Sequence, residues 1–356
     1  MTSPVSVRDG HPARGDRPVA SILLFAYNHE SFIEEALLSA LRQDVPGFEL
    51  IVVDDASTDA TREIIERVLA QAAPPGLVVR KLFKERNGGL LAAVNDAMAM
   101  AAGPIFMAMA GDDVSLPDRL SRTLGHFEGS PDVQLVYGEC IKVDAEGRHL
   151  SKPPAARRPR RFSYDQAPLG RIYASASPFG AAAAYRRELY DFFGPMVPGT
   201  HGEDNCYWIR ALLLGVVLRD SACYIHWRQH GNNLSNFAVK GHCGEWQRRH
   251  LKWMELHATF SPQWRTDIRL ARERGIISAG RAWRLRWAGA REDRTWALEV
   301  SSLRCDPWAH WGWRALALLR VGRFSSTRNF FRLRLSEVRR EHRWQFWAKI
   351  KSNPQL

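Results

Sequence analysis

The chain has 356 residues, 45% of them hydrophobic, so it is long enough for two domains and apolar enough to fold around a packed core. Its five cysteines include no CxxC pair, which argues against a disulfide framework or a zinc site and fits a reducing cytoplasm. The polar residues 1–18 lack the apolar segment of a secretory signal, and we expect a disordered lead. No run of 18 apolar residues occurs, so we expect no transmembrane helix.

The formal net charge of +12 is unevenly distributed along the chain. Residues 245–356 contain 24 Lys or Arg and 10 Asp or Glu, so they carry the whole positive excess. They also contain 11 of the 13 tryptophans. This change of composition predicts a catalytic or binding domain at 19–242, followed by a basic, helical C-terminal region at 243–356.

The segment 19–137 alternates between strand-like and helix-like patterns. Short continuous apolar runs, typical of strands buried on both faces, occur at 19–26, 48–53, 77–83, 105–109 and 133–137. Helix-like segments separate them, and we expect Ser31 to cap the first and Ser57 or Thr58 the second. The order βαβαβαβαβ predicts an α/β fold with a mostly parallel, Rossmann-like sheet flanked by helices.

Three polar segments follow strands of this predicted sheet, at the edge where such sheets bind ligands. They read AYNHE at 26–30, DDASTD at 54–59 and AGDD at 110–113. An Asp pair after a strand is often only a helix cap with a solvated neighbour, but two pairs at matching positions favour a binding function.

The two Asp pairs suit different ligands. Carboxylate oxygens are hard ligands, so Asp112 and Asp113 are candidates for holding Mg²⁺ or Mn²⁺, which neutralises a leaving pyrophosphate. Asp54 and Asp55 suit hydrogen bonds to a base or ribose.

The stretch ASILLFAYNHESFIEEALLSALRQDVPGFELIVVDDASTD, residues 20–59, resembles the inverting glycosyltransferases of the GT-A fold known as family 2. The resemblance continues through Asn87-Gly88, Asn95 and GDDVSLPDRL at 111–120, and it thins toward residue 237. Two residues depart from the family pattern. Ala56 replaces a glycine, a change that we expect to be mild at a negative φ, and Ala110 replaces the first aspartate of D-x-D-D, which leaves one carboxylate fewer for the metal.

The resemblance implies a nucleotide-sugar donor, with a UDP-sugar favoured, and a saccharide or lipid-linked saccharide acceptor used in cell-surface polysaccharide synthesis. It implies that the nucleotide is bound by residues in the loops and helices that follow the strands: Ala26, Tyr27, Asn28, Glu30, Asp54, Asp55, Lys84, Asn87 and Asn95.

A second acidic pair, Glu203-Asp204, precedes the helical pattern at 205–215. We expect the positive end of that helix to keep a carboxylate ionised. The pair resembles the acidic motif in the second half of family 2 enzymes, and this resemblance assigns the general base to Asp204, with Glu203 beside it. Removal of the acceptor proton during attack opposite the leaving nucleotide would invert the anomeric carbon.

The segment 225–235 (IHWRQHGNNLS) is similar to a family segment of the form YR.H..N.S. Arg228 and His230 are therefore candidates for neutralising phosphate or reaching the metal. A lone histidine is about as often a structural residue, so this assignment stays open.

The region 243–356 allows two interpretations. Its Arg and Trp residues suit helices on an anionic membrane surface, which would make the protein cytoplasmic and peripheral to the inner face of the cell membrane. They equally suit packing onto the catalytic domain. No nucleic-acid recognition motif accompanies the charge, so we expect no nucleic-acid partner.

Two other functions compete with a glycosyltransferase. A sugar-phosphate nucleotidyltransferase usually carries a Gly-rich loop after its first strand, where this chain has AYNHE. A non-catalytic protein that binds a nucleotide or a membrane would explain Ala110, but the retained acidic pairs at 112–113 and 203–204 argue against it.

Overall fold

The computed structural model describes residues 17–155, 158–163, 179–198, 200, 202–231, 233 and 260–282. The chain divides into two compact units, one of residues 1–239 and 259–286 and the other of residues 240–258 and 287–356. All described residues belong to the first unit, so most of the predicted basic region lies outside them. No helix in these described ranges is long and apolar enough to cross a bilayer.

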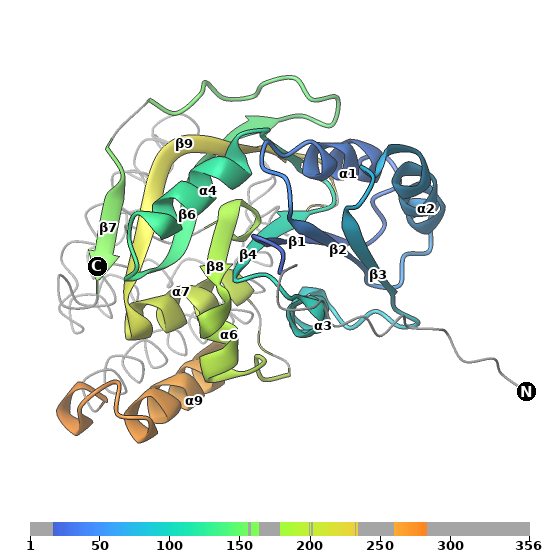
Figure 1. Cartoon of the computed structure of the whole chain (residues 1–356). Helices are drawn as coiled ribbons and strands as arrows, with labels where there is room; N and C mark the ends of the chain where they lie inside the picture. The colour runs from blue at the N-terminus through green and yellow to red at the C-terminus, as the bar shows by residue number, and fades with distance from the viewer. Residues whose placement is uncertain are drawn as a thin grey trace, which may run out of the picture. The chain divides into compact units, whose positions relative to one another are not determined.

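A mixed sheet with helices on both faces forms the centre of the first unit (Figure 1). Its strand order is β3-β2-β1-β4-β8-β6-β9-β5, and β7 pairs with β9. The strands are β1 (Ser21–Ala26), β2 (Glu49–Asp54), β3 (Val78–Phe83), β4 (Ile105–Ala110), β5 (Val114–Ser115), β6 (Val133–Val143), β7 (Arg160–Ser163), β8 (Ala183–Arg186) and β9 (Val216–Arg228). The first four long strands are parallel, and β8 lies antiparallel between β4 and β6. The predicted, mostly parallel α/β fold is thus confirmed.

The alternation of side chains along β1 explains why helices cover both faces of the sheet. Ile22 and Leu24 pack against one set of helices, whereas Leu23 and Phe25 pack against the other. The first set is α1 (Ile33–Leu41), α2 (Thr61–Ala72) and α4 (Arg119–Glu128). The second set is α3 (Leu90–Met100), α6 (Arg187–Phe193), α7 (Glu203–Leu214) and α9 (Phe260–Glu273), and a short 3₁₀ turn, η2 (Gly180–Ala182), precedes β8.

The predicted side-chain caps of the first two helices are absent. Neither Ser31 nor Ser57 caps a helix, and the residues at the N-caps of α1 and α2, Phe32 and Ala60, make no capping hydrogen bond through their own side chains. The Ser57 hydroxyl is bound to Asp54 instead, and the Thr58 N–H donates to Asn28 Oδ1 at 2.8 Å. Ser57 and Thr58 therefore bind residues of the loops that follow β1 and β2, at the edge of the sheet, instead of capping α2.

A buried ion pair joins α9 to α7. Arg210 and Asp267 are 0% and 1% exposed, and their two contacts measure 3.0 and 3.2 Å. Gln263 donates to Asp267 at 2.8 Å and accepts the Val197 N–H at 2.6 Å. Helix α9 lies beyond the boundary predicted at residue 242, yet it packs within the same unit as α7.

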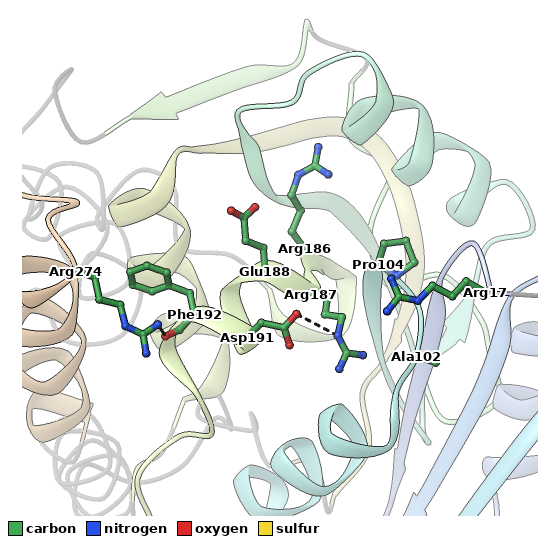
Figure 2. Close-up of a pocket in the computed structure, with 9 residues that line it drawn as sticks. All are labelled: Arg17, Ala102, Pro104, Arg186, Arg187, Glu188, Asp191, Phe192 and Arg274. Atoms are coloured by element: carbon green, nitrogen blue, oxygen red, sulfur yellow. Dashed lines mark hydrogen bonds and ion pairs between the residues drawn. The ribbon is translucent and has the colours of Figure 1, made fainter. Parts of the chain in front are cut away.

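A hollow of about 500 Å³ lies near the ends of several helices (Figure 2). Two of its arginines already bind main-chain carbonyls: Arg186 donates to Phe127 at the end of α4, and Arg274 donates to Phe192 in α6. Pro104, also in its lining, precedes β4, so this hollow lies at the amino end of that strand and not at the edge where the sequence predicts ligands. We regard these arginines as helix caps.

We expect the Asp267→Ala variant to lose about 3–5 kcal/mol of unfolding free energy, because the buried Arg210 charge would be left without its carboxylate. Urea denaturation measures this loss. The double variant Arg210→Met/Asp267→Leu removes both charges and should recover most of the stability. A loss below about 1 kcal/mol in the single variant would contradict the stabilising role of this pair.

Candidate functional site

The three polar segments predicted to bind ligands meet at one edge of the sheet. In the parallel register of the strands, Ala26 lies opposite Asp54 and Phe25 lies opposite Ala110. The loops after β1, β2 and β4 therefore emerge side by side, as the sequence predicts.

Asp112 is the centre of a polar cluster at this edge. Its Oδ2 lies 3.0 Å from His230 Nε2, accepts a hydrogen bond from Asn233 Nδ2 at 3.2 Å, and lies 3.9 Å from His29 Nε2. Gly111 allows this approach, because a Cβ there would lie 2.8 Å from His29 Nδ1. The structure thus brings together Asp112 and His230, which were predicted as site residues.

Sequence reasoning missed His29 and Asn233. Both lie inside segments that the sequence analysis singled out, AYNHE and IHWRQHGNNLS. The polar residues near Asn28 and His230 in these segments could therefore have been identified from the sequence.

Arg228 fixes the turn that contains Asp112 and Asp113. Its main-chain N–H donates to Asp113 Oδ1 at 2.9 Å, and its Nε donates to the Asp112 carbonyl at 3.1 Å. The guanidinium also binds the Ala145 carbonyl at 2.7 Å and the Glu35 carboxylate. Because Arg228 is only 3% exposed, we assign it a positioning role rather than the predicted contact with phosphate.

Burial and charge act differently on the two carboxyls after β4. Burial and the charge of Asp112 raise the pKa of Asp113 well above its ordinary value. Burial also opposes ionisation of Asp112, but the hydrogen bond from His230 and the charge of His29 outweigh it, so the pKa of Asp112 is lowered. Asp112 is therefore the better metal ligand of the two. Among the described residues, however, no group of three or more His, Cys, Asp or Glu side chains is arranged to hold a metal ion.

Asp54 is fully buried and shapes the loop after β2. It accepts the Ser57 N–H at 3.0 Å and pairs with Arg62 Nε at 2.7 Å. Asn28, which carries an unusual positive φ of 54°, ties the neighbouring loop to this one. Asp54 and Asn28 thus build the edge, and the Asp54 carboxylate and Asn28 Oδ1 are occupied by the protein.

Asp55 organises the loop after β3. It accepts the N–H groups of Gly88 and Gly89 at 3.0 and 2.7 Å, and it pairs with Lys84 Nζ at 2.8 Å. Asn87 Oδ1 accepts the same Gly89 N–H at 3.1 Å. Of the predicted nucleotide contacts, Asp55 and Lys84 therefore bind each other, and Asn87 shares the Gly89 N–H with Asp55.

The remaining predicted nucleotide contacts differ in their access to ligand. Tyr27 is 44% exposed, so its ring is open to a base, whereas Ala26 is 3% exposed. Glu30 accepts an N–H from the N-cap residue of α2 at 3.0 Å. Asn95 on α3 makes two hydrogen bonds of 2.9 Å to the main chain of Met196, which makes it a structural link.

Ala56 adopts a φ of 66°, in the left-handed region. At a negative φ, the change from the family glycine would be mild. At this positive φ it is not mild, because the Cβ of a non-glycine residue approaches the following carbonyl oxygen.

Replacement of Ala56 by glycine should raise the unfolding free energy by about 0.5–1 kcal/mol, since relief of the left-handed strain exceeds the greater chain entropy of glycine. Thermal or urea denaturation is the measurement. Ala60→Gly is the matched control, because Ala60 has a φ of −74° and should only lose stability. Equal losses in both variants would refute the strain at Ala56.

The pair Glu203-Asp204 starts helix α7, as predicted. Asp204 Oδ1 accepts the Asn205 N–H at 2.8 Å, and Gly180 lies so close that a Cβ there would be 2.8 Å from Glu203 Oε1. Burial raises the pKa of Asp204 to about 6, and burial together with the charge of Asp204 raises the pKa of Glu203 to about 8. Desolvation therefore outweighs the helix dipole at both carboxyls, and of the two only Asp204 is mostly ionised at pH 7.

The strand register connects this pair to the edge that carries Asp112. Ala184 in β8 lies opposite Met107 in β4, and the two strands are antiparallel. The turn η2 before β8 is therefore level with the carboxyl end of β4, and Gly180 in that turn touches the Glu203-Asp204 pair. Both acidic pairs thus belong to one end of the sheet.

Comparison with known proteins identifies relatives of the first half of the chain. Residues 21–193 match the model of the family described as Glycosyl transferase family 2. An uncharacterized glycosyltransferase of Nostoc sp. is 27% identical over 60% of this chain and 65% of its own length. A putative teichuronic acid biosynthesis glycosyltransferase of Bacillus subtilis, TuaG, is 32% identical over 42% of this chain and 57% of its own length. The chain thus spans less than two thirds of these relatives.

Solved structures share the fold at low identity. S. aureus TarS in complex with UDP-GlcNAc has a TM-score of 0.54 and 18% identity, over 86% of this chain and 93% of its own. The mannosyltransferase PcManGT from Pyrobaculum calidifontis, in complex with GDP-Man and Mn²⁺, has a TM-score of 0.51 and 18% identity, over 97% and 87% of the two chains. Both show the GT-A fold.

Proposed function

Residues 21–193 of this chain belong to glycosyl transferase family 2, and on this premise we propose that the protein is an inverting glycosyltransferase. It moves a sugar from a nucleoside diphosphate donor, a UDP-sugar, to a saccharide or lipid-linked saccharide acceptor. The observation that carries the proposal is the presence of two acidic pairs, at 112–113 and 203–204, at one end of the sheet. Similarity to the teichuronic acid enzyme supports a role in cell-surface polysaccharide synthesis.

The donor diphosphate would lie against the loops after β1, β2 and β4. The UDP-GlcNAc and GDP-Man complexes of proteins with this fold support a nucleotide-sugar as the ligand, and this edge is where sheets of this type bind ligands. Asp112 and His230 fit a divalent cation, because a carboxylate oxygen and an imidazole nitrogen lie 3.0 Å apart at this edge of the sheet. Bound Mg²⁺ or Mn²⁺ would supply positive charge to the departing diphosphate. Ala110 offers no carboxylate, so the cation would depend on Asp112.

Asp204 is the proposed general base. With a pKa of about 6 it is mostly ionised at pH 7, whereas Glu203, with a pKa of about 8, keeps its proton. The ionised carboxylate takes the proton of the acceptor hydroxyl as that oxygen attacks the anomeric carbon. Attack from the face opposite the diphosphate inverts the configuration of that carbon.

Membership in glycosyl transferase family 2 argues against the sugar-phosphate nucleotidyltransferase alternative. We retain residues 19–242 as the main part of the proposed catalytic domain, extended by α9. The proposed cytoplasmic location and the membrane-surface role of the basic residues stay predictions, since most of 243–356 lies outside the described residues.

Asp204→Asn should lower turnover by about 10²–10⁴-fold, because the amide takes no proton, while leaving the affinity for UDP within about twofold. UDP release from UDP-sugars with a saccharide acceptor measures turnover. The matched control is Glu203→Gln, which replaces a carboxyl protonated at pH 7 by a neutral isostere and should keep activity within about tenfold. Unchanged turnover in Asp204→Asn would rule out Asp204 as the general base, whereas absence of turnover in the wild type would favour the non-catalytic alternative.

The pH profile of the same enzyme gives a second readout. A base with a pKa near 6 works in its ionised form, so kcat/KM should level off above about pH 7 and approach a tenfold fall per pH unit below about pH 5. Glu203→Gln should keep this acid limb. An acid limb that persists unaltered in the residual activity of Asp204→Asn would assign it to another group.

A further inference from the structure

Two aromatic side chains, Phe179 and Trp227, lie in contact, and each is followed in the chain by a residue that contacts one of the acidic pairs. Their ring centroids are 4.7 Å apart, and their planes are inclined by 54°. Each side chain is half-buried, and its inner part packs on the hydrophobic cluster of the α1 face. That packing accounts for the buried part of each ring. The exposed part of each ring has no role in the core and is open to a ligand.

Phe179 is joined to the proposed base through its neighbour in the chain. Gly180 follows it directly, and a Cβ at Gly180 would lie 2.8 Å from Glu203 Oε1 and 3.3 Å from the Asp204 Cβ. The Ala182 N–H donates to the Phe179 carbonyl at 2.9 Å, which closes the turn between Phe179 and β8. Since consecutive Cα atoms lie about 3.8 Å apart, the Phe179 main chain is within one residue of the proposed base.

Trp227 is likewise adjacent in the chain to a residue that contacts the loop proposed to bind the donor. It precedes Arg228, whose N–H and Nε bind Asp113 and the Asp112 carbonyl. The indole has a defined position, because Trp227 pairs with Lys142 in the register of β6 and β9, and the Lys142 ammonium lies 4.8 Å from the ring centroid. The contact between Phe179 and Trp227 therefore connects the general base to the loop of Asp112.

An acceptor sugar must occupy this region for in-line attack. The donor diphosphate takes the side of Asp112, so the acceptor hydroxyl has to approach from the side of Asp204. A pyranose ring presents C–H groups on one face and hydroxyls at its rim. Such a face suits the electron-rich face of an aromatic ring, while the rim keeps its hydrogen bonds.

We propose that Phe179 and Trp227 form an aromatic platform on which the ring of the acceptor saccharide stacks beside Asp204. This inference rests on the proposed glycosyltransferase function and adds to it the surface that selects the acceptor. It assigns Trp227 and Phe179 to acceptor binding and not to donor binding.

The test is saturation-transfer NMR on the full chain with UDP and Mg²⁺ and a panel of probes. The probes are both anomers of the methyl glycosides of glucose, galactose, mannose and N-acetylglucosamine. We compare the wild type with Trp227→Leu and Phe179→Leu, which keep an apolar side chain but lose the aromatic face. Phe192→Leu is the matched control, because Phe192 is a half-buried aromatic residue in the hollow at the opposite end of the sheet.

We expect at least one glycoside to receive saturation at its ring C–H protons in the wild type and in Phe192→Leu. Both platform variants should lower that signal at least fivefold while the UDP signals stay unchanged. The platform is overturned if no glycoside of the panel binds the wild type, or if the glycoside signals survive in both variants. Absent UDP signals in the wild type would instead count against the proposed function, so the two failures are distinguishable.

Discussion

The geometry of the ligand edge depends on one buried cation, the guanidinium of Arg228. Removal of such a charge from water costs several kcal/mol unless partners offset it. Here three segments supply partners for the guanidinium: the Asp112 carbonyl after β4, the Glu35 carboxylate on α1 and the Ala145 carbonyl after β6. In addition, the Asp113 carboxylate accepts the main-chain N–H of Arg228. These bonds fix the turn after β4, so Asp112 is oriented before any ligand arrives, which is the condition for a preorganised site.

The same physics separates the two members of each acidic pair. Two neighbouring carboxyls that are withdrawn from water do not both ionise readily, so partners decide which one carries the charge. The histidines around Asp112 lower its pKa, whereas Asp113 has the raised value. At the start of α7, Asp204 has the lower pKa because main-chain N–H groups bind it, and Glu203 has the higher. In each pair, therefore, one carboxyl ionises more readily than its neighbour: Asp112 is suited to a cation, and Asp204 is suited to accepting a proton.

The parallel strands and the loops after them could be predicted from the sequence, because buried parallel strands are continuous apolar runs and ligand loops follow their ends. The short strand β8 has no such signal, since AAYR is too short to distinguish strand from helix. The packing of α9 on α7 depends on Arg210 and Asp267, which are 57 residues apart, and no local pattern reveals such a pair. The φ of Ala56 and the partners of Arg228 are likewise set by tertiary structure.

The proposed function requires that the edge around Asp112 binds a nucleoside diphosphate together with a divalent cation. Calorimetric titration of the full chain with UDP, with and without Mg²⁺, measures this binding. The account predicts binding that depends on Mg²⁺ and that weakens at least tenfold in Asp112→Asn, but not in the control Asp118→Asn, whose carboxylate pairs with Arg122 on the surface. Absence of UDP binding with Mg²⁺, or equal binding by Asp112→Asn and the wild type, would contradict the account.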